Sequence, residues 1–440
     1  SWFSCPISAK SSFIVFRVSL RSLLALLAAV SSLTSLAAAP QSTSDADLVA
    51  RVVDLLDRRL AVMPEVAAIK AREKKPIADP AREQVVLDQS VADARTLQLD
   101  AEAARAFFSI QIVMARAIQE QLHAQWQAGS TQPPPARDLV QAIRPELDAL
   151  GRELLPAVYL ASPALVATPL PEQQTRLSRL RRHPGITAEH LAELARALGG
   201  LRIVATPTWA TLQRVGVLRV GTTGDYAPFS EDTTGTLRGA DILLAEQLGQ
   251  AWGLRVLFIR TTWPALMADL AAQRFDLAAS GISINAERTR AAAFSMPYLV
   301  DGKTPIARRA DAARFATLEQ IDQPGVRVIV NPGGTNERFT RENIRRATII
   351  VHPDNRTIFT EIAAGRADVM FTDGIEVRLQ SARLPALSGT RAEPFTQAGK
   401  AVLLPRDSEL TARVDAWLAP RIASREIPRQ LAQAIAAAAK

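Results

Sequence analysis

Apolar residues recur at helical spacing through the first half of the chain. In the runs Leu48–Val62 and Ala103–Met114 they return every three to four positions, which is the period of an amphipathic helix. Pro64 interrupts the first pattern and is expected to kink the helix or to open a new first turn. The last predicted helix stops at the glycine pair 199–200. Because no alternating strand pattern occurs here, residues 45–200 are predicted to form an all-α domain.

The pattern changes at about Val215, where short β-rich runs begin to alternate with helical ones. The predicted strands are Val217–Val220, Arg255–Ile259, Val326–Val330, Thr348–Val351, Val369–Phe371 and Ala401–Leu404, and the predicted helices are Ala240–Trp252, Pro264–Gln273 and Thr357–Ala364. Such alternation is typical of an α/β domain with a largely parallel sheet. We therefore expect a multidomain protein with a linker over residues 201–214 and an α/β domain over residues 215–440.

The first 37 residues have the pattern of an export signal. Arg17 and Arg21 precede the apolar segment Leu23–Ala29 and a stretch of small residues that allows cleavage near Ala37. The apolar segment is short for a membrane span, and an uncleaved anchor is the alternative. We expect a periplasmic protein without stable membrane association after cleavage. The single cysteine, Cys5, lies in the part removed, so neither a disulfide nor thiol chemistry is expected in the mature protein.

Composition narrows the class of protein. A chain of 440 residues is expected to hold two or three domains, and 48% hydrophobic with 22% charged residues is typical of globular proteins. The net charge of +8 favours the binding of small anions. Nucleic acid is not expected as a partner, because no Lys/Arg run interleaved with aromatic residues occurs. Metal-ligand spacing is not found either, and an oligomer is left open.

Cationic residues lie beside apolar faces in the predicted helices, and by themselves they would be interpreted as a solvated surface. The segment Leu56–Glu83, however, reads LDRRLAVMPEVAAIKAREKKPIADPARE, and it is followed by DARTLQLD at Asp93–Asp100 and FFSIQI at Phe107–Ile112. These segments resemble the secreted, γ-class all-helical chorismate mutases. The resemblance implies rearrangement of chorismate to prephenate. It also implies four cationic ligands and one polar group at the breaking ether oxygen, which are Arg59, Lys70, Arg82, Arg144 and Gln119.

The chemistry of that rearrangement fits such residues. It is concerted, without proton transfer or covalent intermediate, and the substrate carries two carboxylates. Arginine forks bind carboxylates in a bidentate manner, and preorganised donors such as Lys70 and Gln119 stabilise charge on the ether oxygen. A neutral glutamine donates at any pH. We therefore expect the four cations to converge on one site in the helical domain.

Three segments of the second half share a different resemblance. Leu218–Ser230 reads LRVGTTGDYAPFS, Asp276–Arg288 reads DLAASGISINAER, and Phe294–Tyr298 reads FSMPY. They resemble the periplasmic amino-acid-binding proteins. The resemblance implies two α/β lobes that close on a ligand, with crossovers expected near Lys303–Ile306 and Gly399–Val402.

The same resemblance implies roles for individual residues. Arg288 would clamp a ligand carboxylate, assisted by backbone N–H groups near Ser283 and Thr335. Asp373 would meet an ammonium group, with a structural role as the alternative. Aromatic residues after the predicted strands would sandwich a ring unless they belong to the core; these are Tyr226, Phe229 and Trp263.

Further segments resemble one enzymatic branch of that family. They are VNPGGTNERF at Val330–Phe339, DGKTPI at Asp301–Ile306, HPDNRTIF at His352–Phe359 and FTDGIE at Phe371–Glu376. The branch is that of the cyclohexadienyl (prephenate/arogenate) dehydratases. The resemblance implies Asn336 as a substrate-orienting group and Glu376 as the general acid.

Decarboxylating dehydration of prephenate is driven by aromatisation and needs no cofactor. It requires an acid for the leaving hydroxyl and a closed pocket that desolvates the departing carboxylate. Glu376 can supply the proton near neutral pH only if burial raises its pKa; the alternative is a Glu376 that faces solvent.

Two functions follow from these resemblances. One is a bifunctional exported enzyme that converts chorismate into prephenate and prephenate into phenylpyruvate, with arogenate as a further candidate substrate. The other is an amino-acid-binding transport receptor fused to a chorismate mutase. The first is favoured, because the product of the first reaction is the substrate of the second. Neither a cofactor nor a metal is expected.

Overall fold

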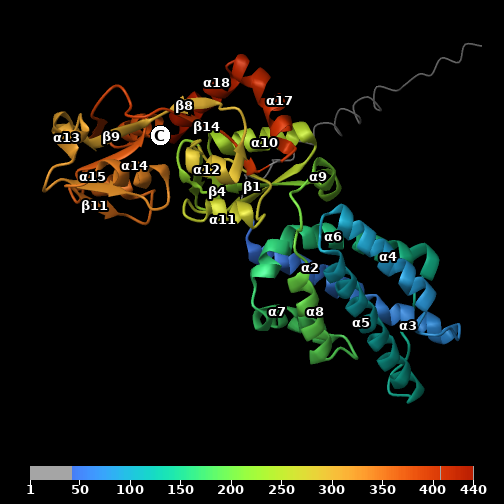
Figure 1. The fold of residues 1–440 in the computed structure, drawn as a ribbon. Helices are drawn as coiled ribbons and strands as arrows, with labels where there is room; N and C mark the ends of the chain where they lie inside the picture. The colour runs from blue at the N-terminus through green and yellow to red at the C-terminus, as the bar shows by residue number, and fades with distance from the viewer. Residues whose placement is uncertain (1–41, 407, 440) are drawn as a thin grey trace, which may run out of the picture. The chain divides into compact units, whose positions relative to one another are not determined.

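Helices occupy the region from residue 45 to residue 200 (Figure 1). The computed structural model describes residues 42–406 and 408–439, and the expected signal peptide lies outside them. The helices are α2 (Asp45–Ala61), α3 (Met63–Arg72), α4 (Pro80–Thr96), α5 (Ala101–Gln127), α6 (Arg144–Ala167), α7 (Leu170–Leu177) and α8 (Ala188–Gly200), with the π-helical turn η1 (Leu139–Ile143) and the 3-10 turn η2 (Ser178–Arg182). In the described part of the chain, no helix combines the length and apolar character that a membrane span requires.

Local sequence explains where these helices begin. Ser44 and Asp47 form a capping box at the start of α2, in which each side chain satisfies a backbone N–H group of the first turn. Pro64 lies in the first turn of α3, where its missing N–H group costs nothing. The break between α2 and α3 is therefore the new first turn that the sequence predicts. Asp79 and Asp100 accept backbone hydrogen bonds at the starts of α4 and α5.

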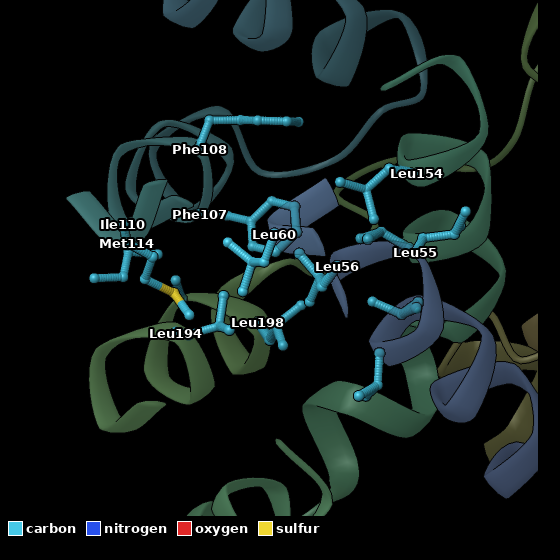
Figure 2. Close-up of a cluster of buried hydrophobic side chains, with 14 of the residues drawn as sticks. Leu55, Leu56, Leu60, Phe107, Phe108, Ile110, Met114, Leu154, Leu194 and Leu198 are labelled. Atoms are coloured by element: carbon cyan, nitrogen blue, oxygen red, sulfur yellow. The ribbon is translucent and has the colours of Figure 1, made fainter. Parts of the chain in front are cut away.

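The helical core is built from apolar faces of α2, α5, α6 and α8 (Figure 2). Its side chains include Leu55, Leu56, Leu60, Phe107, Phe108, Ile110, Met114, Leu154, Leu194 and Leu198, all of them buried. Phe107 and Leu60, both labelled in Figure 2, belong to the same cluster of buried side chains. Packing of these faces against one another accounts for the helical period seen in the sequence.

The remainder of the described chain is α/β. Its strands are β1 (Val217–Thr222), β2 (Asp225–Tyr226), β3 (Ser230–Thr233), β4 (Thr236–Arg238), β5 (Arg255–Arg260), β6 (Leu277–Ala278), β7 (Ala292–Phe294), β8 (Leu299–Asp301), β9 (Lys303–Arg308), β10 (Arg327–Val330), β11 (Thr348–Val351), β12 (Val369–Asp373), β13 (Leu387–Gly389), β14 (Ala398–Lys400) and β15 (Leu403–Pro405). Its helices are α9 (Trp209–Val215), α10 (Ala240–Trp252), α11 (Leu266–Ala271), α12 (Ala286–Ala291), α13 (Leu318–Ile321), α14 (Thr335–Asn343), α15 (Ile358–Ala363), α16 (Gly374–Arg383), α17 (Leu410–Ala423) and α18 (Glu426–Ala438), with the 3-10 turn η3 (Arg309–Arg314). Helix α9 lies in the stretch that was expected to be a linker.

Two five-stranded sheets define two lobes. The first lobe holds the sheet β5-β1-β6-β15-β7, and the second lobe holds the sheet β11-β10-β12-β9-β13. Strand β1 pairs in parallel with β5 and β6, and β10 pairs in parallel with β11 and β12. Strands β15 and β9 run antiparallel to their neighbours. Each sheet is therefore mixed, with a parallel half as the sequence predicts.

The chain passes between the lobes twice. It leaves the first lobe through β8 and returns through β14, and these two strands pair antiparallel with Asp301 opposite Ala398 and Leu299 opposite Lys400. The second crossover overlaps the predicted Gly399–Val402, whereas the first lies just before the predicted Lys303–Ile306, which already belongs to β9 of the second lobe. A second lobe inserted between two adjacent crossover strands can move as a unit, which is the arrangement of a hinged cleft.

The loop after β10 brings helix α14 close to the first lobe. Gly333 has φ +77°, and a Cβ atom at this position would lie 2.5 Å from the backbone nitrogen of Pro264. Both the left-handed backbone and the close approach exclude larger residues. Gly334 then precedes α14, so that Thr335 and Asn336 occupy its first turn.

Removal of a core ring should destabilise the helical region. Phe107→Ala is expected to lower its free energy of unfolding by about 3–5 kcal/mol, because the Phe107 ring is 0% exposed. Val113→Ala on the same helix, 44% exposed, is the matched control and should change stability by less than about 0.5 kcal/mol. Urea unfolding followed by circular dichroism measures both, and equal losses would contradict the assignment of the core.

Candidate active sites

A cleft of about 300 Å³ is lined by both lobes. The first lobe contributes Tyr226, Trp263, Gly281, Ser283 and Arg288, the second contributes Asn331, Gly334, Thr335, Asn336, Asn355 and Asp373, and the crossover strand β14 contributes Lys400. Most of these side chains are polar. The cleft is therefore suited to a small, charged ligand.

Asp373, at the end of β12, is paired with two buried lysines. Nζ of Lys303 donates to Oδ1 of Asp373 at 2.8 Å, and Nζ of Lys400 donates to Oδ2. The hydroxyl of Tyr226 donates to the same Oδ2. Burial alone would raise the pKa of Asp373, but the ammonium groups of Lys303 and Lys400 outweigh it and hold that pKa well below its usual range. Asp373 is therefore ionised at every physiological pH.

A hydrogen-bonded network leads from Lys303 to a buried glutamate. Nζ of Lys303 also donates to Oδ1 of Asn336. Nδ2 of Asn336 donates to Oδ1 of Asn331 and to Oγ1 of Thr372, each at 3.3 Å. The hydroxyl of Thr372 in turn donates to Oε2 of Glu376. Asn336 is thereby fixed in one orientation at the cleft wall.

Glu376 lies in the first turn of α16 and is 1% exposed. Burial raises its pKa to about 8. The charge of Asp373 raises the pKa as well, whereas the Thr372 hydrogen bond and the charge of Lys303 lower it. It is therefore a protonated acid at neutral pH, and the alternative of a solvent-facing Glu376 is wrong. Its carboxyl group lies behind Thr372 and Asn336 and is not among the groups that line the cleft.

Arg288 is the cation that the first lobe contributes to the lining of the cleft. Asn285 caps the short helix α12, and Nη1 of Arg288 donates to the carbonyl oxygen of Ser283 at 3.0 Å. The guanidinium carbon lies 5.9 Å from the centre of the Trp263 ring. Burial lowers the pKa of Arg288 to about 10, so the side chain remains a cation at neutral pH.

Two of the three expected aromatic residues line the cleft. The rings of Tyr226 and Trp263 meet edge to face at 5.8 Å. Phe229 is fully buried behind Tyr226, at 5.1 Å between ring centres. A Cβ atom at Gly281 would lie 2.5 Å from the Phe229 ring, so Phe229 packs against the cleft wall from inside. The expectation that Phe229 contacts a ligand ring is therefore corrected to a core role.

The helical region contains a second cavity, of about 450 Å³. It is lined by Leu56, Arg59, Leu60, Met63, Gln111, Met114, Ala115, Leu147, Leu180 and Leu194. Nη1 of Arg59 donates to the carbonyl oxygen of Leu147 at 3.3 Å. Burial lowers the pKa of Arg59, with Asp148 as the one opposing charge. An anion would thus meet a cation in an apolar enclosure.

Two buried glutamines lie at or near this cavity: Gln111 lines it, whereas the predicted site residue Gln119 does not. Nε2 of Gln119 donates to the carbonyl oxygen of Ala115 at 3.0 Å and lies 3.9 Å from Sδ of Met63. Gln111 donates to the carbonyl oxygen of Phe107 at 3.1 Å. The Oε1 atoms of both glutamines are buried without a hydrogen-bond partner in the described structure. Unpaired buried oxygens of this kind are costly, and one of the two belongs to Gln111 in the lining of the cavity.

The structure does not bring the four expected cations together. Lys70 is partly buried and donates to the carbonyl oxygen of Ile77 at 2.6 Å, and Arg82 and Arg144 are exposed at the starts of their helices. The expected convergence is therefore corrected: of the four, Arg59 alone lines this cavity. The break at Pro64 places Lys70 on a helix other than that of Arg59, and this separates residues that one continuous helix would align.

Several residues of the two sites were not predicted from the sequence. Lys303 and Lys400 complete the cleft network, and Gln111 lines the helical cavity. Lys303 lies in the segment Asp301–Ile306 that carried the family resemblance, and Lys400 lies in the predicted second crossover, Gly399–Val402. The sequence therefore held a signal for both residues. A metal-binding group of His, Cys, Asp and Glu side chains is not found among the described residues.

Known families match both halves of the chain. Residues 218–433 match the bacterial extracellular solute-binding proteins, family 3, and residues 46–120 match chorismate mutase type II. A cyclohexadienyl dehydratase of Pseudomonas aeruginosa is 53% identical over 234 residues, which are 51% of this chain and 87% of that protein. A histidine-binding periplasmic protein of Escherichia coli is 32% identical over 162 residues, 36% of this chain and 61% of that protein.

Solved structures are similar to the same half of the chain. The crystal structure of an ancestral cyclohexadienyl dehydratase has 42% sequence identity and a TM-score of 0.34, and the match covers 52% of this chain and 97% of that one. The crystal structure of an ancestral amino-acid-binding protein has 30% identity and a TM-score of 0.48, with coverage of 52% and 99%.

The protonation state of Glu376 can be measured directly. Infrared spectroscopy should show a buried carboxylic acid absorption at pH 7 that disappears with a midpoint near pH 8, as the pKa of about 8 requires. The band should be absent from Glu376→Gln. Asp241, whose pKa burial raises to about 6, provides an internal comparison that titrates earlier. If the Glu376 band were lost with a midpoint below pH 5 as the pH is raised, this assignment would be contradicted.

Proposed function

The chain belongs to the family of the cyclohexadienyl dehydratases, built on the family 3 solute-binding fold and preceded by a type II chorismate mutase region, and we propose on this premise that it is a bifunctional enzyme of phenylalanine biosynthesis. The helical domain converts chorismate into prephenate. The two-lobed domain converts prephenate into phenylpyruvate, carbon dioxide and water. A transport receptor fused to a mutase is less well supported, because the similarity to a cyclohexadienyl dehydratase, 53% identity over 87% of that protein, exceeds the similarity to a histidine-binding protein, 32% over 61%.

The burial of Glu376 at the end of the hydrogen-bonded network through Asn336 and Thr372 is the observation that carries the dehydratase assignment. An acid with a pKa of about 8 is poised to give its proton near neutral pH. We assign to it protonation of the ring hydroxyl of prephenate. Because its carboxyl group does not line the cleft, the proton must pass through the hydroxyl of Thr372 or the side chains of Thr372 and Asn336 must turn aside when the substrate binds. The bond from the ring to that oxygen breaks and water leaves, while the electrons of the bond to the departing carboxylate enter the ring and carbon dioxide is released.

The other cleft residues bind and orient the substrate. Arg288, together with backbone N–H groups near Ser283 and Thr335, holds one carboxylate by charge-assisted hydrogen bonds. Asn336, fixed by Lys303, orients the substrate toward Glu376. The rings of Tyr226 and Trp263 contact the ring of the substrate. The closed cleft excludes water from the carboxylate that departs.

For the mutase we assign the helical cavity as the binding site. Arg59 binds a carboxylate of chorismate. Gln119, which contacts the lining residues Met63 and Ala115, would turn its amide to the ether oxygen when the substrate binds. Lys70, Arg82 and Arg144 remain proposed ligands on the strength of the family resemblance, and they would have to move toward the cavity to bind. The rearrangement needs no proton transfer, so a neutral amide suffices.

The two reactions are consecutive on one chain. We propose an all-α mutase domain over residues 45–200, a connection over residues 201–214 and a dehydratase domain over residues 215–440. We further propose that the chain is exported to the periplasm through the signal in residues 1–37, in keeping with its relationship to extracellular solute-binding proteins. Its partners are small molecules, and we propose that it uses no cofactor.

Substitution of the acid should separate the two activities. Glu376→Gln is nearly isosteric and introduces no buried charge, but it has no proton to give. Dehydration of prephenate should therefore fall by ~10²–10⁴-fold, while conversion of chorismate continues and prephenate accumulates. Both products are followed over time by chromatography after addition of chorismate.

The matched control for this variant is Glu342→Gln, whose side chain is 62% exposed on α14. It should produce phenylpyruvate at the wild-type rate. Phenylpyruvate formation at a near-wild-type rate by Glu376→Gln would show that the acid is another group. Chorismate left untouched by the wild-type protein, while added prephenate is consumed, would overturn the mutase assignment alone.

The mutase assignment has its own test. Arg59→Ala should lower kcat/KM for chorismate by at least ~10²-fold, as loss of a preorganised charge contact does, with turnover of added prephenate unchanged. The neighbouring exposed Arg58→Ala is the control and should retain activity. Equal kcat/KM values for the two variants would remove Arg59 and its cavity from the mutase site.

A further inference from the structure

We propose that Arg383 is a latch that holds the two lobes closed, because it connects the helix of the acid Glu376 to the first lobe at a place outside the cleft. Arg383 is the last residue of α16, which packs on β9, β12 and β13 of the second lobe. Its partners belong to the first lobe, and it does not line the cleft. The inference goes beyond the proposed function, since a receptor and an enzyme both require closure.

The first partner of the latch is Glu231 in strand β3. Nη2 of Arg383 donates to Oε1 of Glu231 at 2.9 Å and to Oε2 at 3.1 Å. The two side chains are 24% and 19% exposed, so water screens their attraction less than it screens an exposed pair. Strand β3 pairs with β2, whose Tyr226 lies in the core of the first lobe. The ion pair therefore joins one lobe to the other.

The second partner is the carboxyl end of helix α18. Nε of Arg383 donates to the carbonyl oxygen of Ala438, the last residue of that helix. The last carbonyl groups of a helix have no partner within it, and the helix dipole places partial negative charge there. Ile427 and Leu431 of α18 lie in the core of the first lobe. The first lobe thus presents a carboxylate and a helix end together, and the guanidinium of Arg383 binds both.

Arg383 lies on the same face of α16 as the acid. Glu376, Gln380 and Arg383 are spaced i, i+4 and i+7, which keeps side chains on one face of a helix. Glu376 and Gln380 are buried, whereas Arg378 on the opposite face is exposed. Seven residues correspond to about 10 Å along the helix axis. The latch therefore binds the helix of Glu376 to the first lobe at a point two turns from the acid.

Opening of the cleft breaks these contacts. Helix α16 moves with the second lobe, whereas β3 and α18 belong to the first, and a rotation about the paired crossover strands β8 and β14 separates them. Because the contacts of Arg383 are made in the closed form alone, they shift the equilibrium toward that form. A second pair, Arg338 and Glu287, also bridges the lobes at 3.1 Å, but its side chains are 40% and 75% exposed, and exposed pairs contribute little.

Loss of the latch should weaken binding and leave the acid intact. Arg383→Met keeps an apolar stem, and Glu231 stays paired with Arg238 at 2.8 Å. Kd for prephenate, measured by calorimetry in the Glu376→Gln background, is expected to rise about 5–10-fold, the scale of one charge-assisted contact, because a smaller share of the protein is closed. KM should rise by the same factor when Glu376 is present. The value of kcat and its pH profile should be nearly unchanged, since the contacts of Glu376 remain.

A double-mutant cycle tests the ion pair itself. Glu231→Gln should weaken binding to a similar degree, and adding Arg383→Met to it should bring little further change, because the two side chains share one interaction. Arg383→Lys keeps the charge and should retain part of the affinity. Arg378→Met, at the exposed arginine of the same helix, is the matched control and should bind prephenate as the wild type does. Turnover of chorismate should be unchanged in all of these variants.

Small-angle X-ray scattering measures closure without a ligand. Arg383→Met should have a larger radius of gyration than the wild type and Arg378→Met. Unchanged Kd values and radii, or independent, additive effects of the two substitutions in the cycle, would overturn the latch. If the wild type does not bind or convert prephenate, the dehydratase function fails, and the radii decide alone: a larger radius in Arg383→Met supports the latch, and equal radii refute it.

Discussion

The ion pairs of one buried carboxylate connect the parts of the two-lobed domain on which its chemistry depends. Asp373 ends a strand of the second lobe, Lys303 follows the first crossover, Lys400 ends the second, and Tyr226 belongs to the first lobe. A buried charge is costly unless it is paired and hydrogen-bonded. The ion pairs and hydrogen bonds of Asp373 therefore form only when both crossover strands and both lobes are in position around it.

The same arrangement separates two carboxyl groups that are close in sequence. Asp373 and Glu376 are both fully buried, but Asp373 is given two ammonium groups and Glu376 a single hydroxyl donor. The first is therefore held ionised and the second protonated. Pairs of titratable groups whose environments move their pKa values apart are the usual basis for assigning acid and base roles. Here the ionised partner also helps to keep the proton on its neighbour.

The regular elements could be predicted from the sequence because local signals decide them. Helix Ala240–Trp252 is found as predicted and ends at Gly253, whose backbone is left-handed, and strand Thr348–Val351 is found as predicted. Pro64 opens a new helix as its chemistry requires. Arg288, Asn336 and Asp373 line one cleft, as the family resemblance implied.

What escaped prediction depends on contacts between distant residues. The partners of Asp373 lie 70 and 27 residues away, and a buried lysine looks the same in a sequence as an exposed one. Phe229 resembles its neighbour Tyr226 in pattern, and only packing distinguishes the wall of a cleft from its backing. The scattered placement of Lys70, Arg82 and Arg144 depends on helix directions that spacing along one helix cannot give.

The position of β15 has a consequence for the order in which the lobes can be completed. This strand, Leu403–Pro405, lies between β6 and β7 in the sheet of the first lobe, whereas every strand of the second lobe's sheet precedes residue 390. During synthesis the second lobe can close its sheet while the first, begun earlier, still exposes two unpaired strand edges. Such edges invite association with other chains, and pairings between residues far apart in sequence form slowly. The first lobe is thus the part of the domain that stays open to association with other chains until β15 has paired.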